Sequence, residues 1–482
     1  MPAQDLRQFI ARLEAAGQLR RVAAPVSAHL EIAEIASRLV AEAGPAALFE
    51  NVEGSGMPVL VGAFASAQRM AWALGGEDLD TIAAGLAGLL RPPAADAGLL
   101  EKLKAAPRLL KAAGAAPKTV RSGPCQTIVH EGRDADLGHL PVLTCWPGDG
   151  GPFVTLPQVY TAAPDGGRNV GMYRLQVFGP RRLGLHWHRD HDGARNYAAW
   201  SVRGEPMPVA VALGGDPVLT YAATAPLPHG MDELVLAGIL RGEPVRLVRC
   251  RTVPLAVPAD AEIVIEGTVA PDATAVEGPF GDHTGYYSPA DAYPVLDVTA
   301  ITHRPDAVYP ATVVGRYPKE DCWLAKATER LFLPVIRTVL PEVVDLNLPL
   351  FGVFHNWAIV SIRKSHAHQA RKVMHALWGM GQMMYTKFLV VVDEGVNVQD
   401  TEEVFWRVGA EVDPQRDLVL TTGPADVLDH AAPTQGAAGK LGIDATRKLP
   451  EEAPGVAWPE PIGSDPEVAD RVTRRWEEFG LT

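Results

Sequence analysis

The sequence predicts a multidomain α/β protein in which a β-rich central domain separates two α/β domains. The chain has 482 residues, more than one hydrophobic core usually supports, and this length predicts about three domains. Helix and strand patterns alternate at both ends, whereas short strands and turns fill the middle. We therefore expect domains at 1–120, 121–318 and 319–482.

The first domain begins with an amphipathic helix. Leu6, Phe9, Ile10 and Leu13 recur at the spacing of one helical face, and Asp5 stands before them as an N-cap. Later segments continue the alternation of helix and strand. They are a second helix over 30–44 that ends on Gly44, apolar runs at 46–50 and 58–64, helical stretches at 67–76 and 80–90, and a marginal surface helix within 91–120.

The central domain is predicted to be a barrel or a sandwich. Between residues 121 and 315, β-rich segments are separated by turns containing Gly and Pro. We expect a hairpin over 176–185 with the turn Gly-Pro-Arg-Arg. We also expect a strand over 169–174, flanked by Asn169 and Arg174.

The third domain returns to helix and strand. A long helix is predicted over 322–340, and alternating α/β segments follow it. A last helix over 465–480 is expected to pack on a neighbouring subunit.

Bulk composition indicates a cytoplasmic enzyme. A formal net charge of −13 argues against nucleic acid or an anionic membrane surface as partner. Four cysteines without a Cys-x-x-Cys pair are typical of reduced thiols in the cytosol. The N-terminus lacks the apolar core of a secretory signal, and no apolar run is long enough to predict a membrane span.

A histidine-rich stretch, LHWHRDHDG at 185–193, offers one candidate site. His186, His188, Asp190 and His191 fit H-x-H-x-D-H, the ligand string of dinuclear zinc hydrolases. Such a centre also needs a histidine further along the chain, and the candidates are His229, His283 and His303. A histidine-rich polar surface loop is the other interpretation.

The stretch VEGPFGDHTGYYSP at 276–289 offers a second candidate site. Two carboxylates, Glu277 and Asp282, lie five residues apart in it, and we expect one pKa to be raised so that this acid can donate a proton. The glycines in this stretch, at 278, 281 and 285, are expected to let the backbone approach a ligand. Arg174 is the expected partner. An ordinary surface turn with solvated acids, and an exposed arginine, remain the alternatives.

Together these segments resemble the UbiD family of prenylated-FMN-dependent decarboxylases. The resemblance covers nearly the whole chain, because several independent strings follow one another in the family's order. They are NVGMYRLQVFG, MDELVLAGILRGEPV, PADAEIVIEG, VEGPFGDHTGYYSP, TVVGRYPKEDCWLAKATERLFLP, YTKFLVVVDEGVN and LDHAAPTQGAAGKLGIDATRK.

The resemblance implies reversible, non-oxidative removal of CO₂ from an aromatic or α,β-unsaturated carboxylic acid, in quinone biosynthesis or aromatic acid metabolism. It implies prenylated FMN as the electron sink, because no side chain can delocalise a carbanion on an sp² carbon. It also implies a central split β-barrel of the flavin reductase type around that cofactor. A flavin prenyltransferase would supply the cofactor, and the chain would form a homo-oligomer, a dimer or a hexamer.

The family's site residues carry over onto this sequence by position. The catalytic set is Arg174, Glu277 and Asp282, with Asp282 as proton donor and Glu277 as the partner that holds Arg174. The cofactor set is Met172, Tyr173, Arg174, His186, Trp187, His188, His191, Asp192 and Lys387. A Mn²⁺ or Mg²⁺ ion, with K⁺ nearby, would link the cofactor phosphate to the protein. Its ligands would be Asn169, Glu233 and Asp190, with His191 as the alternative third ligand.

Overall fold

The computed structural model describes residues 4–90, 114–188, 191–434, 436–455, 458–459 and 462–480. Most of the marginal helix predicted within 91–120 and the predicted metal ligand Asp190 lie outside these residues. None of the described helices combines the length and the apolar character that crossing a membrane requires.

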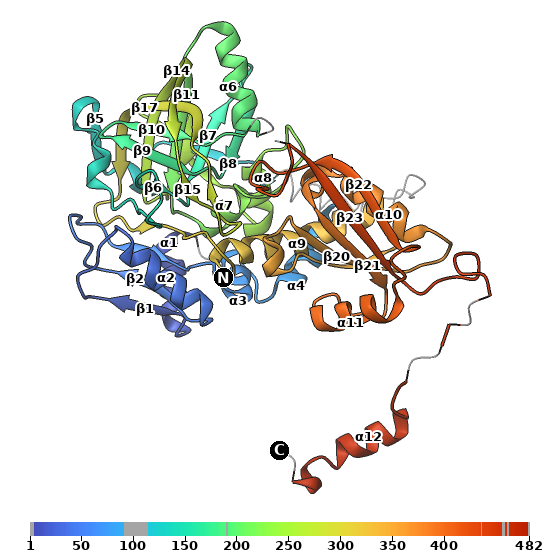
Figure 1. Cartoon of the computed structure of the whole chain (residues 1–482). Helices are drawn as coiled ribbons and strands as arrows, with labels where there is room; N and C mark the ends of the chain where they lie inside the picture. Colours follow the sequence, from blue (N-terminus) through green and yellow to red (C-terminus); the bar gives the residue numbers. More distant parts are fainter. Residues whose placement is uncertain are drawn as a thin grey trace, which may run out of the picture.

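The N-terminal part is a small α/β unit (Figure 1). Its elements are α1 (Leu6–Ala15), β1 (Leu19–Val22), α2 (Glu31–Ala41), β2 (Ala46–Phe49), β3 (Val59–Val61), α3 (Ala67–Ala73) and α4 (Leu79–Leu90). The predicted first helix is confirmed, since Asp5 accepts a hydrogen bond from the Gln8 amide and all four apolar residues of the predicted face are buried. The second helix ends at Ala41, three residues before the predicted Gly44.

The strands of this unit form a four-stranded sheet in the order β1-β2-β3-β18. The last strand, β18 (Tyr309–Pro310), comes from the end of the central segment and runs parallel to β3. The chain therefore returns to its first sheet before it enters the C-terminal part.

The central part is built on a nine-stranded sheet in the order β6-β9-β10-β17-β14-β11-β7-β8, with β5 paired to β17. Its strands are β5 (Ile128–Glu131), β6 (Phe153–Val154), β7 (Gln158–Ala162), β8 (Arg168–Gly171), β9 (Leu175–Gly179), β10 (Arg182–Leu185), β11 (Met207–Leu213), β14 (Ile263–Glu277) and β17 (Asp291–His303). The predicted hairpin is confirmed as β9 and β10. Among the described residues, no pairing joins β6 to β8, so the sheet does not close into a barrel.

Smaller elements surround this sheet. They are β4 (Lys118–Val120), η1 (Pro124–Gln126), η2 (Gly132–Asp134), η3 (Leu137–His139), α6 (Asp192–Arg203), α7 (Pro217–Ala222), α8 (Glu233–Arg241), β12 (Arg246–Arg249), β13 (Ala256–Pro258), β15 (Phe280–Gly281) and β16 (Tyr287–Ser288). Strand β11 shows how the sheet is buried on both faces. Ala210 and Ala212 belong to one hydrophobic core, whereas Val209 and Val211, which point the other way, belong to a second.

The C-terminal part is a five-stranded sheet in the order β19-β20-β21-β23-β22 with helices on both faces. Its elements are α9 (Glu320–Val339), β19 (Val343–Asn347), η4 (Leu350–Gly352), β20 (Trp357–Ile362), α10 (Gln369–Trp378), η5 (Gly381–Tyr385), β21 (Phe388–Asp393), α11 (Thr401–Glu411), β22 (Leu418–Pro424), β23 (Ala437–Ala445), α12 (Pro466–Arg474) and η6 (Glu477–Phe479). Strands β20, β21 and β23 are parallel. Strands β20 and β21 are buried on both faces and appear in the sequence as largely apolar runs, whereas β23 also contains Lys440 and Asp444.

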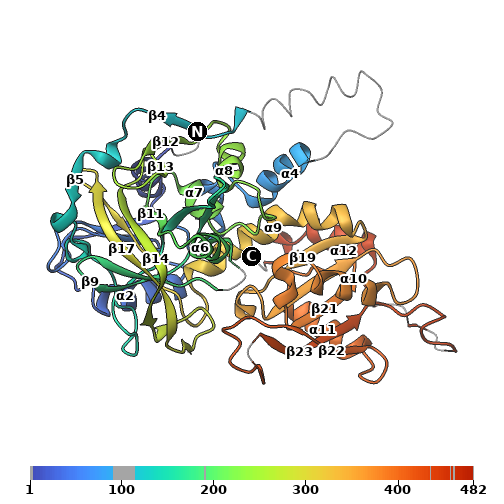
Figure 2. The ribbon, with the colours of Figure 1, turned by 90° about the horizontal axis from the view of Figure 1, so that it is seen from above.

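Helix α9, which was predicted, joins the parts of the molecule. It contacts α3 and α4 of the N-terminal part and β19 of the C-terminal sheet, and it lies between these parts in both views (Figures 1 and 2). Helix α12 confirms the predicted last helix, and Figure 1 shows it set apart from the rest of the chain.

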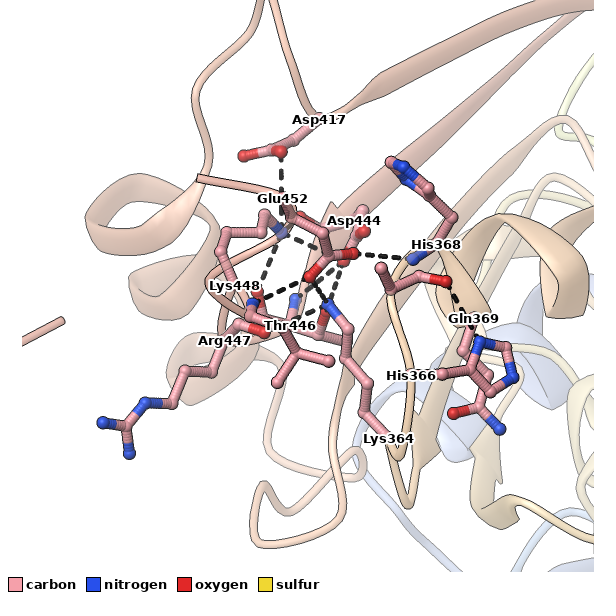
Figure 3. A network of polar contacts seen from close by, with 12 residues as sticks. Lys364, His366, His368, Gln369, Asp417, Asp444, Thr446, Arg447, Lys448 and Glu452 are labelled. Carbon is pink, nitrogen blue, oxygen red and sulfur yellow. Dashed lines mark hydrogen bonds and ion pairs between the residues drawn. The ribbon is translucent and has the colours of Figure 1, made fainter. Parts of the chain in front are cut away.

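A buried polar network fixes the end of the C-terminal sheet (Figure 3). Lys364 donates hydrogen bonds to Glu452 at 2.5 Å and to the Thr446 hydroxyl at 2.9 Å. Lys448 forms an ion pair with Asp444 at 3.1 Å. Since every charge in this group has a partner, the network pins the segment after β23 against the sheet.

Candidate active site

Arg174 lies in a short connection between two strands. The predicted strand over 169–174 is wrong in its second half, because β8 ends at Gly171 and β9 begins at Leu175. The Tyr173 ring folds back onto Gly171, where an added Cβ would lie 2.2 Å from the ring. This break in the strand turns the Arg174 side chain toward the two acids.

The two acids come from neighbouring elements. Glu277 is the last residue of β14, and Asp282 follows β15 in the turn that leads to β16. Strands β15 and β16 pair as a small antiparallel hairpin. The sequence spacing of five residues therefore spans the end of one strand and the tip of a hairpin.

Arg174 holds both acids at once. Its Nε donates to Glu277 Oε1 at 2.8 Å, and its Nη1 contacts Asp282 Oδ2. Its Nη2 also donates to the Ser288 hydroxyl at 2.9 Å, and the guanidinium lies 4.5 Å from the centre of the Phe280 ring. The side chain of Glu277 is fully buried, and those of Arg174 and Asp282 are each 8% exposed. The alternative of solvated surface acids is therefore excluded.

The expected rise in the pKa of one acid is wrong. Burial alone would raise both pKa values. Hydrogen bonds from His186 and Arg174, however, hold the pKa of Glu277 below its usual range. The hydrogen bond and charge of His283, with the charge of Arg174, do the same for the pKa of Asp282. These hydrogen bonds and positive charges outweigh the effect of burial on both pKa values, so both acids are carboxylates in this structure.

The glycines of this stretch pack against protein, which corrects the expectation that they make room for a ligand. An added Cβ on Gly281 would lie 2.1 Å from the Trp146 ring, and one on Gly278 would lie 3.3 Å from Ala290. Gly278 and Gly285 also have positive φ angles of 94° and 84°. These glycines shape the hairpin that presents Asp282.

The histidine-rich stretch forms a hydrogen-bonded ladder that starts at Glu277. His186 Nδ1 lies 3.0 Å from Glu277 Oε2, and His186 Nε2 lies 2.6 Å from His188 Nε2. The rings of His188 and His191 stack at 4.8 Å. Burial lowers the pKa of His188 to about 3, with the neighbouring histidines contributing. The ladder is therefore neutral at His188.

This ladder does not support the dinuclear zinc alternative. Both ring nitrogens of His186 are engaged with protein atoms, and its Nε2 is paired with His188 rather than directed at a shared ion. Within the described part of the chain, no three His, Cys, Asp or Glu side chains come together as a metal-binding group.

A cavity of about 170 Å³ lies beside Arg174 and the ladder. Six residues of the predicted cofactor set line it: Met172, Tyr173, Arg174, His186, His188 and His191. Asp282 and Phe280 line it from the hairpin, and Leu428 lines it from the C-terminal part. The cavity therefore lies where the central and C-terminal parts meet.

The other three predicted cofactor residues do not line this cavity. Trp187 is buried behind it, and its Nε1 has no hydrogen-bond partner among the described residues. Asp192 binds Arg195 and His229 at 2.9 and 2.8 Å. Lys387 forms an ion pair with Asp429 at 2.6 Å, next to the Leu428 that reaches the cavity.

Two of the predicted metal ligands lie together at one edge of the site. Asn169 and Glu233 are 7% and 8% exposed, and Glu233 accepts a hydrogen bond from the Val170 amide at 3.0 Å. Among the described residues, no lysine or arginine forms an ion pair with Glu233, and burial raises its pKa to about 7. A buried carboxylate and an amide oxygen are the hard ligands that Mn²⁺ or Mg²⁺ takes, so these residues fit such an ion.

Sequence reasoning missed five residues that line the cavity or bind Arg174: Thr155, Phe280, Ser288, Val314 and Leu428. Phe280 and Ser288 lie within the stretch that was singled out, but nothing in their spacing indicated a contact with Arg174. Leu428 comes from another domain, and no local pattern could place it at the cavity.

Comparison with protein families gives three matches in chain order. They are the N-terminal, the Rift-related and the C-terminal domains of 3-octaprenyl-4-hydroxybenzoate carboxy-lyase, at residues 10–86, 118–317 and 322–445. A protein of Archaeoglobus fulgidus with no assigned activity is 47% identical over 99% of both chains.

Two solved structures extend the comparison. The UbiD-class enzyme HmfF from Pelotomaculum thermopropionicum, in complex with FMN, is 32% identical with a TM-score of 0.82, covering 97% of this chain and 98% of HmfF. The vanillic acid decarboxylase of Sedimentibacter hydroxybenzoicus, in closed form, is 26% identical with a TM-score of 0.85 over 100% of both chains. The three domain matches and the likeness to HmfF over nearly the full length show that this chain belongs to the UbiD family.

Proposed function

We propose that this protein catalyses the reversible, non-oxidative decarboxylation of an aromatic carboxylic acid with prenylated FMN as electron sink. The observation that carries the proposal is the buried Arg174 bound to both Glu277 and Asp282 at the wall of a cavity. Family membership supports it. Similar structures include HmfF in complex with prFMN and decarboxylases named for vanillic and 3,4-dihydroxybenzoic acids. An α,β-unsaturated acid is the other substrate class.

The residues at the cavity have different roles in the reaction. When bound, the cofactor supplies the electron sink that the carbanion left by CO₂ requires. Arg174 is planar and permanently charged, so it orients the substrate carboxylate. Glu277 holds Arg174 in place, and Asp282 gives a proton to the carbon that has lost CO₂.

The cofactor would lie against Met172, Tyr173 and the histidine ladder, with Trp187, Asp192 and Lys387 further out. Its phosphate is an anion, and Glu233 is a buried carboxyl group with no cationic side chain of the described residues bound to it. A divalent cation, Mn²⁺ or Mg²⁺, would therefore join them through Glu233 and Asn169. We assign its third ligand to Asp190 or His191 and a K⁺ ion to the same region.

The proposal extends to the domains and the assembly of the protein. We propose three domains, 1–120, 121–318 and 319–482, with the central sheet acting as a split β-barrel around the cofactor. We also propose a homo-oligomer, a dimer or a hexamer, assembled through α12. A flavin prenyltransferase would supply the finished cofactor.

A substrate screen tests the proposal. The protein is produced together with a flavin prenyltransferase and incubated with vanillic, 3,4-dihydroxybenzoic, 4-hydroxybenzoic and cinnamic acids. We expect CO₂ release from at least one aromatic acid, and none from the same protein loaded with FMN alone. Absence of CO₂ release from the whole panel, with prenylated FMN bound, would contradict the proposal.

A further inference from the structure

His283 connects the proposed proton donor to the C-terminal part of the chain. Its Nδ1 lies 3.0 Å from Asp282 Oδ1, and its backbone amide donates to the same oxygen at 2.8 Å. Its Nε2 lies 2.8 Å from Nε2 of His355. Asp282, which faces the cavity, is therefore hydrogen-bonded to His283, and His283 is hydrogen-bonded to His355.

The C-terminal part holds His283 from two sides. Phe354 stacks on the His283 ring with centroids 4.7 Å apart, and His355 meets it edge-on at 5.1 Å. Val353 and Phe354 adopt positive φ angles of 40° and 57°, which residues other than glycine rarely do. The backbone here departs from ordinary conformations at the two residues that lead into His355, and the ring contacts keep His283 in one orientation.

Three acids favour a protonated His283. It binds Asp282 on its own turn, and the negative charges of Asp321 on α9 and Asp426 after β22 act on it as well. Burial alone would lower its pKa, but Asp282 and then the other two acids raise it above the usual range. Burial and the charge of His283 lower the pKa of His355 to about 4. His283 is therefore the imidazolium of the pair, and neutral His355 accepts its Nε2–H.

The reaction needs a proton that Asp282 does not hold. Decarboxylation consumes one proton for each CO₂, since RCOO⁻ and H⁺ give RH and CO₂. Asp282 is a carboxylate bound to Arg174 and His283, so it must receive a proton before it can give one.

We infer that His283 stores the proton that Asp282 delivers to the substrate carbon, an inference that rests on the proposed function. The Nδ1–H bond of His283 breaks as an O–H bond forms on Asp282, and the electron pair stays on the nitrogen. That O–H bond then breaks as the C–H bond of the product forms. His283 is left neutral, and solvent restores its proton after the product leaves.

Arg174 supplies the trigger for the first transfer. Its guanidinium binds Asp282 in this structure, and an incoming substrate carboxylate competes for the same N–H groups. Loss of this contact raises the proton affinity of Asp282, because the nearby positive charge is then shared with another anion. The proton therefore moves from His283 to Asp282 only when substrate is bound. His283 is a positioning residue in this scheme, since it acts through Asp282.

The variant His283→Asn removes the transferable proton but keeps a hydrogen-bond donor to Asp282. An asparagine amide can still donate to Asp282 from the place of Nδ1, but it cannot carry a removable proton. We expect kcat to fall by about 10²-fold, the lower end of what a positioned proton-transfer group contributes, with KM and cofactor content unchanged. The matched control is His366→Asn, which replaces an exposed histidine and should behave as wild type.

The pH profile gives a readout that a purely structural role would not move. Because the pKa of His283 is raised, its imidazolium is present below that pKa and is lost as the pH rises through it. We expect kcat of wild type to fall on the alkaline side and this fall to be absent in His283→Asn. A profile of the variant identical to that of wild type, with full kcat, would overturn the inference.

Histidine ¹⁵N NMR of the cofactor-loaded protein measures the protonation state of His283 directly. It requires neither turnover nor a His283 variant. We expect the His283 titration to move to lower pH in Asp282→Asn, and a neutral His283 in wild type at pH 6 would overturn the inference.

Failure of the proposed function and failure of this inference give different results. If wild type releases no CO₂ from the panel above, the proposed function fails. If Asp282→Asn is inactive while His283→Asn is fully active, only the inference fails.

Discussion

A single guanidinium determines the charge state of the site. Arg174 is bound to two buried carboxylates and one hydroxyl. Each buried acid would otherwise be costly to keep ionised. The arginine therefore has two roles. It stabilises the ionised form of both acids in the resting protein, and it offers a planar binding group to the substrate.

Replacing Arg174 by lysine should separate these two roles. Lysine keeps the charge but is a point donor that cannot make the paired hydrogen bonds of a guanidinium. We expect kcat/KM on a panel acid to fall by about 10²-fold or more, equivalent to roughly 3 kcal/mol, as for breaking a buried pair. Bound flavin, measured by absorbance, should be unchanged. Wild-type kcat/KM in Arg174→Lys would contradict this role.

Glu233 gives a second test at the residue scale. Glu233→Ala removes the buried carboxylate proposed to bind the divalent ion, and we expect cofactor affinity to fall by at least about tenfold, as when a metal site loses support. Flavin retained after gel filtration measures the effect. Glu205→Gln, which removes an exposed negative charge, is the control and should retain cofactor. Equal retention in both variants would remove Glu233 from the site.

The residues that carry the chemistry could be named from sequence, but their charge states could not. Glu277, Asp282 and Arg174 stand in recognisable strings, and the structure brings them together. The predicted rise in pKa failed because Arg174 lies between the acids and His186 and His283 lie beside them. His283 is the sequence neighbour of Asp282, but the contacts of Arg174 and His186 with the acids link residues about 90 to 110 positions apart, a distance over which periodicity carries no information.

At the scale of elements, amphipathic patterns were reliable and strand interruptions were not. Helix α1 and the hairpin of β9 and β10 follow from apolar spacing and from a Gly-Pro turn. The break between β8 and β9 is set by the Tyr173 ring against Gly171. Strands β14 and β17 pair with two register shifts, and no local pattern marks where those shifts fall.

The network in Figure 3 predicts a stability effect in the C-terminal part. Lys364 and Glu452 are each 4% exposed. Glu452→Ala leaves Lys364 buried without its carboxylate, and we expect the free energy of unfolding to fall by about 3 kcal/mol, as for breaking a buried ion pair. Urea denaturation followed by tryptophan fluorescence measures it. Glu451→Ala alters an exposed neighbour and should change stability little; equal effects of the two variants would contradict the role of the network.

At the scale of the whole molecule, helix α12 stands apart from the other described elements (Figure 1). Val468 and Val472 lie on it, Trp476 continues the four-residue spacing just beyond its end, Phe479 follows in η6, and all four side chains are exposed. Such a stripe is the face that a helix buries against another surface. The proposed assembly through α12 places this stripe on a second copy of the chain.

Removing residues 463–482 should therefore reduce the oligomeric state. We expect light scattering after gel filtration to give a lower mass for this truncation and for Val472→Asp. Asp470→Ala alters an exposed residue off the apolar stripe and should keep the mass of the full chain. Unchanged mass in the truncation would show that another surface holds the oligomer.

The arrangement of the domains was the part least accessible to sequence. Three domains were expected, and three family matches follow one another along the chain. The contribution of β18 to the first sheet and that of Leu428 to the cavity both depend on contacts between distant segments. Such contacts arise only once whole domains pack together.

In the proposed mechanism, Asp282 protonates the carbon from which CO₂ departs. Solvent-deuterium exchange at that carbon, followed by NMR when the cofactor-loaded protein is incubated in D₂O with the decarboxylated product of an active panel acid, tests it most directly. We predict exchange by wild type and by Asp291→Asn, which alters an exposed acid opposite Glu277 in the β14–β17 pairing. We predict none by Asp282→Asn with cofactor still bound. Exchange by Asp282→Asn at the wild-type rate would contradict the account.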